Sequence, residues 1–170
     1  AYSTHDIDDG VEAGLISDSM LRDVEIWQRA RSEALRNGAE ENAPYLHAYT
    51  LRCLIDMLVG NVIAHSENSL AQAQPESSAS VRRMDTKLID FAPEYQDLTR
   101  ELRRFLSEYV YWHTTVLTVN RRCERIVDEL FAFYLAHPEE MGAGARGRIS
   151  RFGPHRSVAD YIAGMTDRYI

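Results

Sequence analysis

Residues 51–63 of this chain, LRCLIDMLVGNVI, place their apolar side chains along one stripe of an α-helix. Apolar residues recur there at spacings of three and four, which is the periodicity of a single helix face. The stripe contains Leu51, Leu54, Ile55, Leu58, Val59, Val62 and Ile63. We expect this segment to be a core helix whose apolar face is covered by other helices of the chain.

Helical periodicity of the same kind occurs on both sides of this segment. Two later stripes are expected to pack together as a helical hairpin. They contain Leu98, Leu102, Phe105, Leu106, Tyr109 and His113, and then Cys123, Ile126, Val127, Leu130, Phe131 and Tyr134. An earlier helix is expected to be capped by Ser17 or Asp18 and to end near Gly38. A last helix is expected to begin near Ser157, after a Gly-Pro pair that breaks the pattern.

Two polar stretches interrupt the helical pattern and are predicted to be long loops. Residues 66–80 are rich in Ser, Gln, Ala and Glu, and residues 137–156 are rich in Gly and Arg. Apart from an extended piece at residues 88–91, no stretch alternates with period two, so strands are not expected. The sequence therefore predicts an all-α helical bundle with two long polar loops, in which residues 1–170 form a single all-helical fragment.

The composition is that of a globular domain with an acidic balance. The 170 residues are 45% hydrophobic and 26% charged, and the formal net charge is -7. This charge argues against non-specific duplex binding, which needs a concentrated basic face. No apolar run reaches the roughly 20 residues that cross a bilayer, and no export signal opens the sequence. We therefore expect neither a membrane nor a duplex partner, and we expect a cytoplasmic location.

The cysteines and most of the histidines show no metal-binding pattern. Cys53 and Cys123 lie inside helical patterns without a CxxC motif, so both are expected to be buried small hydrophobic residues. The histidines after position 40 lack the HxH, HxxxH and HExxH spacings that bring two imidazoles to one ion. They are His47, His65, His113, His137 and His155. A metal site built from this chain is therefore not expected.

The first ten residues, AYSTHDIDDG, concentrate four ionisable side chains into five consecutive positions. A calcium loop beginning at Asp6 is excluded by the spacing, since Ser17 takes the position that a glutamate must occupy. A metal site built on the pair His5-Asp6 would need another histidine well upstream, and only four residues precede His5. The remaining interpretation is a helix that supports the site and faces the substrate; if the segment is helical, Tyr2, Asp6 and Asp9 share one of its faces.

This motif resembles the conserved helix of bacterial HD-domain triphosphohydrolases of the dGTPase type. The resemblance rests on residues 2–15, YSTHDIDDGVEAGL, and on residues 160–169, DYIAGMTDRY, which resemble the C-terminal signature of that family. Residues 52–63 also look like its central helix. The resemblance implies that the chain is the C-terminal portion of such a protein, with residues 1–16 ending the HD-type catalytic core and residues 17–170 forming a helical C-terminal region.

The resemblance also implies an activity and roles for individual residues. The family is expected to hydrolyse a deoxynucleoside triphosphate to a deoxynucleoside and inorganic triphosphate, using a divalent metal such as Mg²⁺ or Mn²⁺ whose ligands lie outside this chain. No catalytic or metal-ligating residue is expected here, so the chain alone should be inactive. Tyr2 would lie against the deoxyribose and Asp6 would accept a hydrogen bond from its 3′-hydroxyl, whereas Tyr49 and Arg52 would contact sugar and phosphate. The expected partners are deoxynucleoside triphosphates, the N-terminal half of the same protein, and further copies in a homo-oligomer.

Two other functions remain open at this stage. The chain could be an autonomous helical assembly or regulatory module, or a fragment of another HD-type nucleotide phosphohydrolase; the order and spacing of the two terminal motifs favour the triphosphohydrolase. Asp8 and Asp9 are expected to be solvated or salt-bridged. His5 is expected to orient a carboxylate or to satisfy a core contact, and the pair Asp167-Arg168 to dock the last helix.

Overall fold

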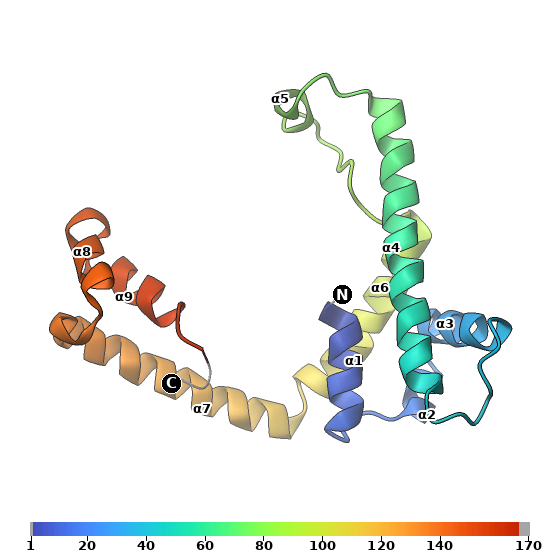
Figure 1. Cartoon of the computed structure of the whole chain (residues 1–170), viewed down its shortest axis with the longest axis horizontal. Helices are drawn as coiled ribbons and strands as arrows, with labels where there is room; N and C mark the ends of the chain where they lie inside the picture. The colour runs from blue at the N-terminus through green and yellow to red at the C-terminus, as the bar shows by residue number, and fades with distance from the viewer. Residues whose placement is uncertain (1, 167–170) are drawn as a thin grey trace. The chain divides into compact units, whose positions relative to one another are not determined.

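The computed structural model describes residues 2–166, and among these residues it contains helices and no strand (Figure 1). The predicted all-α fold is confirmed. The chain divides into two compact units, Ala1–His113 and Thr114–Ile170, which are described separately below. The sequence predicted one fragment over residues 1–170; the assignment of its first 16 residues to a catalytic core stays a prediction.

The first unit is built from six α-helices and a π-helical turn. They are α1 (Tyr2–Glu12), α2 (Asp18–Leu21), α3 (Glu25–Arg36), α4 (Leu46–Ala73), α5 (Ser78–Val81), α6 (Pro93–Leu106) and η1 (Ser107–Tyr111). Helix α3 lies along the N-terminal half of α4, and α1 and α6 pack beside the same half (Figure 1). Each of these four helices turns one apolar face toward the others, so a single hydrophobic core lies between them.

The core of the first unit is centred on the packing of α3 against α4. Ile26, Trp27 and Ala30 of α3 are almost completely buried, as is Leu54 of α4. Their spacing of three and four residues puts them on one side of each helix. Burying one such large side chain contributes roughly 1.5–3 kcal/mol, so this contact holds the helix that carries Tyr49 and Arg52 in place.

Helix α4 is a core helix only in part, which corrects two predictions. It continues to Ala73, so most of the predicted loop at residues 66–80 is helical. Of the predicted stripe, Ile55, Val59 and Ile63 are 37%, 51% and 53% exposed. The apolar stripe is wider than the surface that the neighbouring helices cover, since Leu54 and Leu58 are buried whereas Ile55 and Val59 beside them are exposed. Length adds to this, because 28 residues of helix span about 42 Å and the 12 residues of α3 span about 18 Å.

The helix predicted to run toward Gly38 forms as two helices. Ser17 is the N-cap of the short α2, since its hydroxyl oxygen accepts a hydrogen bond from the backbone N–H of Met20 at 3.4 Å. The chain then bends, and α3 starts after Val24. Helix α3 ends as predicted, because Gly38 adopts a φ of +92° that other residues rarely accept.

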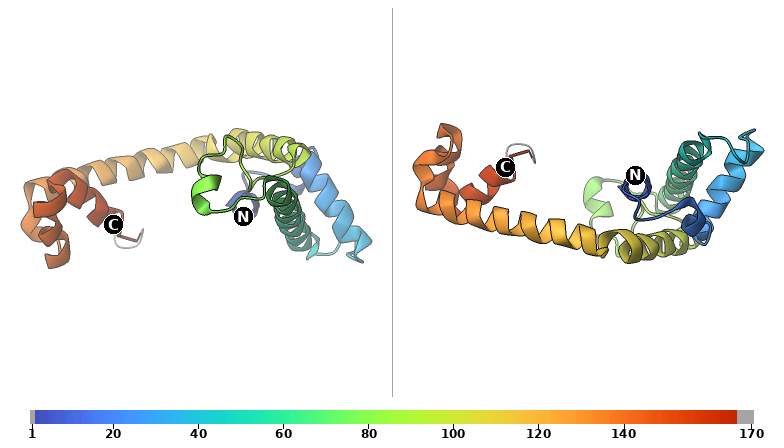
Figure 2. Two further views of the ribbon diagram at one scale, coloured as in Figure 1. Left: turned by 90° about the horizontal axis from the view of Figure 1, so that it is seen from above. Right: turned by 90° about the horizontal axis from the view of Figure 1, so that it is seen from below.

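The second unit is a small cluster around one long helix. It contains α7 (Thr114–Ala136), the 3₁₀ turn η2 (Pro138–Glu140), α8 (Ala143–Phe152) and α9 (Pro154–Ile162). Figure 2 shows α8 and α9 folded beside the C-terminal half of α7. Met141, Ala145, Val158 and Ile162 form its buried core. The prediction of a loop at residues 137–156 is therefore wrong, because half of these residues form helix α8 and most of the others belong to η2 and α9.

Helix α6 packs on α1 and α3 within the first unit, and α7 packs on α9 within the second. The hairpin expected between the two later stripes would join these units and stays a prediction. Two smaller predictions are corrected. Cys123 is exposed, although Cys53 is buried as predicted. The last helix begins at Pro154, three residues before Ser157. The pair Asp167-Arg168 lies outside the described residues.

By length and apolar composition, α4 is the one helix among the described residues that could cross a bilayer. One third of its most apolar 18-residue window is buried inside the structure. Leu51, Leu54 and Leu58 of this helix belong to the core of the first unit. Core helices of globular proteins have the same composition, so this feature carries little weight for a membrane.

The two faces of α4 give a direct test of the fold. Leu54→Ala should lower the free energy of unfolding of the first unit by about 2–5 kcal/mol, because it removes a completely buried side chain and leaves a cavity. The matched variant Val59→Ala, on the exposed face of the same helix, should change it by no more than about 0.5 kcal/mol. Urea denaturation followed by circular dichroism measures both values. Equal losses would show that the exposed face is buried in solution.

Candidate functional site

Helix α1 presents the predicted motif on two different faces. Thr4, Ile7 and Gly10, spaced three residues apart, are buried against the first unit. Tyr2 is 88% exposed, whereas Asp6 is half-buried. The helix ends at Glu12, and Gly14 two residues later has a φ of +68°, which suits the turn after a helix C-terminus. The apolar face of α1 therefore fixes the helix and leaves the side of Tyr2 and Asp6 at the edge of the unit.

Helix α1 approaches its neighbour closely at Gly10. A Cβ atom at this position would lie 3.1 Å from Cγ2 of Val110 in η1 and 3.1 Å from Cδ1 of Ile16. Glycine allows this spacing because it has no side chain to occupy the gap. The contact brings the turn of α1 that precedes Gly10 next to η1, and that turn carries Asp6.

The hydroxyl group of Tyr111 donates a hydrogen bond to Oδ2 of Asp6. Tyr111 is the last residue of the π-helical turn η1, and π-helical turns are rare insertions that often occur at functional sites. Burial, followed by the hydrogen bond to Asp6, raises the pKa of Tyr111 from 10.0 to about 12. At neutral pH the phenol is therefore a proton donor, and the carboxylate of Asp6 is held in one orientation.

Tyr49 and Arg52 lie together near the start of α4. They line an open pocket of about 260 Å³ with Tyr45 and Ala48. The ring of Tyr49 is half-buried against the core, while Arg52 is exposed. The structure thus brings these two predicted residues to one surface, and Tyr2 and Asp6 do not line that pocket.

His47 connects three helices of the first unit at one point. Its Nδ1 lies 2.9 Å from Oδ1 of Asp18, and its Nε2 lies 3.6 Å from Oδ1 of Asp8, which is too long for a hydrogen bond. The ring also packs against Trp27 at a centroid distance of 5.2 Å. Asp8 therefore lies within ion-pair distance of His47, and the two side chains form an ion pair only when the imidazole is protonated. His5 is exposed and does not fill a core contact.

Among residues 2–166, no group of three or more His, Cys, Asp or Glu side chains is arranged to hold a metal ion. The carboxylate of Asp6 is bonded to Tyr111, and Asp8 and Asp18 both face the single imidazole of His47. The donors of the first unit therefore do not fit the divalent metal that the resemblance implies.

Two of these residues were not singled out from the sequence. Tyr111 lies 105 residues from Asp6 in the chain, and its position depends on the π-helical turn, which leaves no periodic signal. The spacing of His47 in the sequence indicates only that it lacks a metal-binding pattern. Its position beside Asp8 of α1 and Asp18 of α2 depends on the packing of α4 against these helices, which the sequence does not reveal.

Comparison with known proteins agrees with the family suggested by the N-terminal motif. Residues 89–170 match the family described as the phosphohydrolase-associated domain. The chain is 32% identical over 169 residues to a deoxyguanosinetriphosphate triphosphohydrolase-like protein of Nitrosomonas europaea, covering 99% of this chain and 45% of that protein. Similar proteins of Geobacter sulfurreducens and Ralstonia nicotianae are 32% and 35% identical, again over 99% of this chain and over 44% and 43% of their own lengths. The chain thus spans less than half the length of these curated relatives, consistent with a C-terminal portion.

The bond between Tyr111 and Asp6 predicts a pH dependence. Because the pKa of Tyr111 is raised on folding, its contribution to stability is present below pH 10 and is lost as the pH rises through about 12. The difference in tyrosinate absorbance between the wild-type chain and Tyr111→Phe isolates this titration among the nine tyrosines. Asp6→Asn should move the titration partway toward 10, since burial remains the larger cause.

A control for this titration is Asp9→Asn, which removes a carboxylate one turn further along α1. It should leave the pKa of Tyr111 unchanged, because the hydrogen bond is made by Asp6. A normal pKa near 10 for Tyr111 in the wild-type chain would contradict the geometry at this site.

Proposed function

We propose that this chain, a relative of deoxyguanosinetriphosphate triphosphohydrolase-like proteins, forms the sugar- and phosphate-binding part of a metal-dependent deoxynucleoside triphosphate triphosphohydrolase. The matched domain and the names of the relatives indicate a phosphohydrolase-like role. More specifically, we propose that the longer protein hydrolyses a deoxynucleoside triphosphate to a deoxynucleoside and inorganic triphosphate. The observation that carries it is similarity along 99% of the chain, which includes both α1 and the start of α4.

Asp6 is proposed to recognise the 3′-hydroxyl group of the deoxyribose. Its Oδ2 accepts a hydrogen bond from Tyr111, and among the described residues its Oδ1 has no donor. The protein thus holds one oxygen of this carboxylate, and the other oxygen can accept a hydrogen bond from a hydroxyl group. An analogue without the 3′-hydroxyl would leave this oxygen unpaired in the complex, which is a strong basis for discrimination.

Tyr2 is proposed to test the shape of the sugar. It stands four residues before Asp6, so the two side chains lie on neighbouring turns of the same helix face. Its ring is free to pack on a ligand because it is 88% exposed in this chain. A rigid ring against the C2′ position favours a deoxyribose, since an added 2′-hydroxyl would be crowded.

Tyr49 and Arg52 are proposed to contact sugar and phosphate from the start of α4. Their pocket of about 260 Å³ is below the usual range of roughly 300–1,000 Å³ for a complete ligand site, so it would hold one part of a nucleotide. The exposed guanidinium group of Arg52 can bind two phosphate oxygens at once.

The divalent metal of the proposed reaction, Mg²⁺ or Mn²⁺, is assigned to residues of the longer protein outside this chain. The donor groups described above do not form a site for it among residues 2–166. The relatives are more than twice as long as this chain, which leaves room for such a site.

Replacement of Asp6 in the longer protein tests the sugar assignment. Asp6→Asn should lower kcat/KM for a deoxynucleoside triphosphate by about 10- to 100-fold, which corresponds to the loss of a charge-assisted hydrogen bond. The same variant should lose its preference for that substrate over the 2′,3′-dideoxy analogue. Steady-state kinetics with both nucleotides measures the two effects.

The matched control is Asp9→Asn, an exposed carboxylate on the same helix, which should keep both the activity and the preference. Product analysis separates the reaction from its alternatives. Inorganic triphosphate and a deoxynucleoside are expected, whereas monophosphate with pyrophosphate would contradict the proposed reaction. An unchanged preference in Asp6→Asn would remove Asp6 from sugar recognition.

A further inference from the structure

A basic pocket lies between α6 and the segment that leads into it. Its volume is about 470 Å³. We use the name basic pocket for the site lined by Lys87, Asp90, Gln96, Arg100, Arg103, Arg104 and Ser107. Four of these side chains are cationic and one is acidic, in a chain whose net charge is -7. The pocket therefore carries a local excess of positive charge, whereas the chain as a whole is negatively charged.

The cations of the basic pocket are incompletely neutralised. Lys87 lies 4.0 Å from the carboxylate of Asp90, which is the limit of an ion pair, and Arg100 pairs with Asp97 outside the pocket. The Nε of Arg103 donates to a backbone carbonyl of its own helix at 3.3 Å, which leaves its two terminal nitrogens as donors. Within residues 2–166, Arg104 forms no ion pair. At least two guanidinium groups are thus available to an anion.

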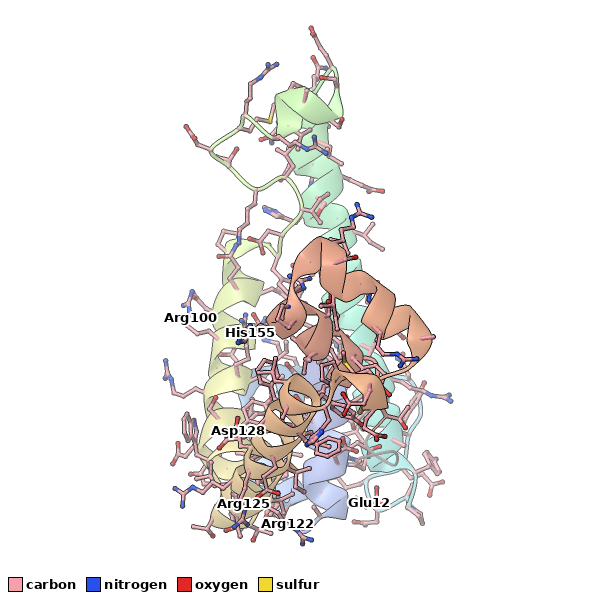
Figure 3. All side chains as sticks on the ribbon, turned by 90° about the vertical axis from the view of Figure 1, so that its left-hand side faces the viewer. Glu12, Arg100, Arg122, Arg125, Asp128 and His155 are labelled. Carbon is pink, nitrogen blue, oxygen red and sulfur yellow. The ribbon has the colours of Figure 1, made fainter. Side chains whose placement is uncertain are left out.

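The helix geometry places these groups on one face. Gln96, Arg100, Arg103, Arg104 and Ser107 follow spacings of three and four along α6 and into η1. Figure 3 shows Arg100 projecting away from the ribbon of α6. Basic residues in the last turn of a helix also stabilise its dipole. That effect does not account for Lys87, which comes from a different segment of the chain.

The segment that carries Lys87 is anchored beside α6. Leu88 is only 7% exposed, and the backbone N–H of Ala92 donates to Oδ1 of Asn61 in α4 at 3.0 Å. The side-chain amide of Gln96 donates to the backbone carbonyl of Phe91 at 3.0 Å. These contacts hold the segment that carries Lys87 against α6, so the cationic side chains of both segments line the same pocket.

We propose that the basic pocket binds an oligophosphate anion, either inorganic triphosphate or the triphosphate chain of a nucleotide. Arginine guanidinium groups bind phosphate oxygens in pairs, and four cationic side chains line the same pocket, so one extended anion there can reach several of them. None of its lining residues is aromatic, so the base-stacking platform that single-stranded nucleic acid requires is missing. This site is separate from Asp6 and does not depend on the proposed reaction.

Isothermal titration of the complete 170-residue chain with inorganic triphosphate tests the proposal. Saturable binding is expected, and it should weaken as salt is raised. The double variant Arg103→Gln/Arg104→Gln should weaken binding at least about tenfold, the factor expected when charged hydrogen bonds are lost. The matched control Arg122→Gln/Arg125→Gln removes the same charge from exposed positions of α7 and should bind like the wild type.

Circular dichroism establishes that each variant is folded. Lys87→Gln provides a second test, since this side chain is 83% exposed and contributes little to folding; it should also weaken binding. Competition with a deoxynucleoside triphosphate distinguishes the two sources: equal affinity points to the phosphate chain alone, and tighter binding points to a nucleotide. Both results support the proposal.

Four results would overturn it. They are no binding of inorganic triphosphate up to millimolar concentration, binding of orthophosphate with equal affinity, equal weakening in the control pair, and binding of a single-stranded oligonucleotide that triphosphate does not displace. Failure of the proposed reaction would leave the binding result intact, so the two proposals can fail independently.

Discussion

The close packing of α1 on η1 at Gly10 is the constraint on which the candidate site depends. No side chain separates the helices there, and a Cβ atom would meet Val110 at 3.1 Å. This contact sets the distance at which Tyr111 reaches Asp6. Alanine normally favours a helix over glycine by about 0.5–1 kcal/mol, so glycine at this position gives up helix stability for proximity. The position of the Asp6 carboxylate therefore depends on the absence of a side chain at Gly10, one turn further along α1.

The core of the first unit includes Ile16 and Val110, the two residues that Gly10 approaches, and it extends to α3 and α4. Trp27 of α3 and Leu54 of α4 are almost completely buried and hold these two helices against each other. His47 then joins α4 to Asp18 in α2 and faces Asp8 in α1. The motif on α1 is therefore tied to the helix that carries Tyr49 and Arg52. Tyr2 and Asp6 do not line the pocket of Tyr49 and Arg52, and the assignment of all four residues to one nucleotide remains our proposal.

The sequence predicted the class of the fold and the start of α2 because these depend on local signals. Helical periodicity identified α4, and Ser17 was identified as a cap. The extent of burial could not be predicted, since Val59 and Leu58 are equally apolar but only one of them faces α3. Tyr111 could not be connected to Asp6 because their contact spans 105 residues and a π-helical turn. Gly10 belongs to the N-terminal motif, but its role in the close packing of α1 on η1 can be recognised only from the position of Val110 in the structure.

The central claim is that Tyr111 acts on sugar recognition through Asp6. A double-mutant cycle in the longer protein tests it, with Tyr111→Phe, Asp6→Asn and the double variant compared for their preference between a deoxynucleotide and its 3′-deoxy analogue. The account predicts that the double variant loses no more preference than Asp6→Asn alone, because Tyr111 has no effect once the carboxylate is gone. Additive losses from the two substitutions would contradict it.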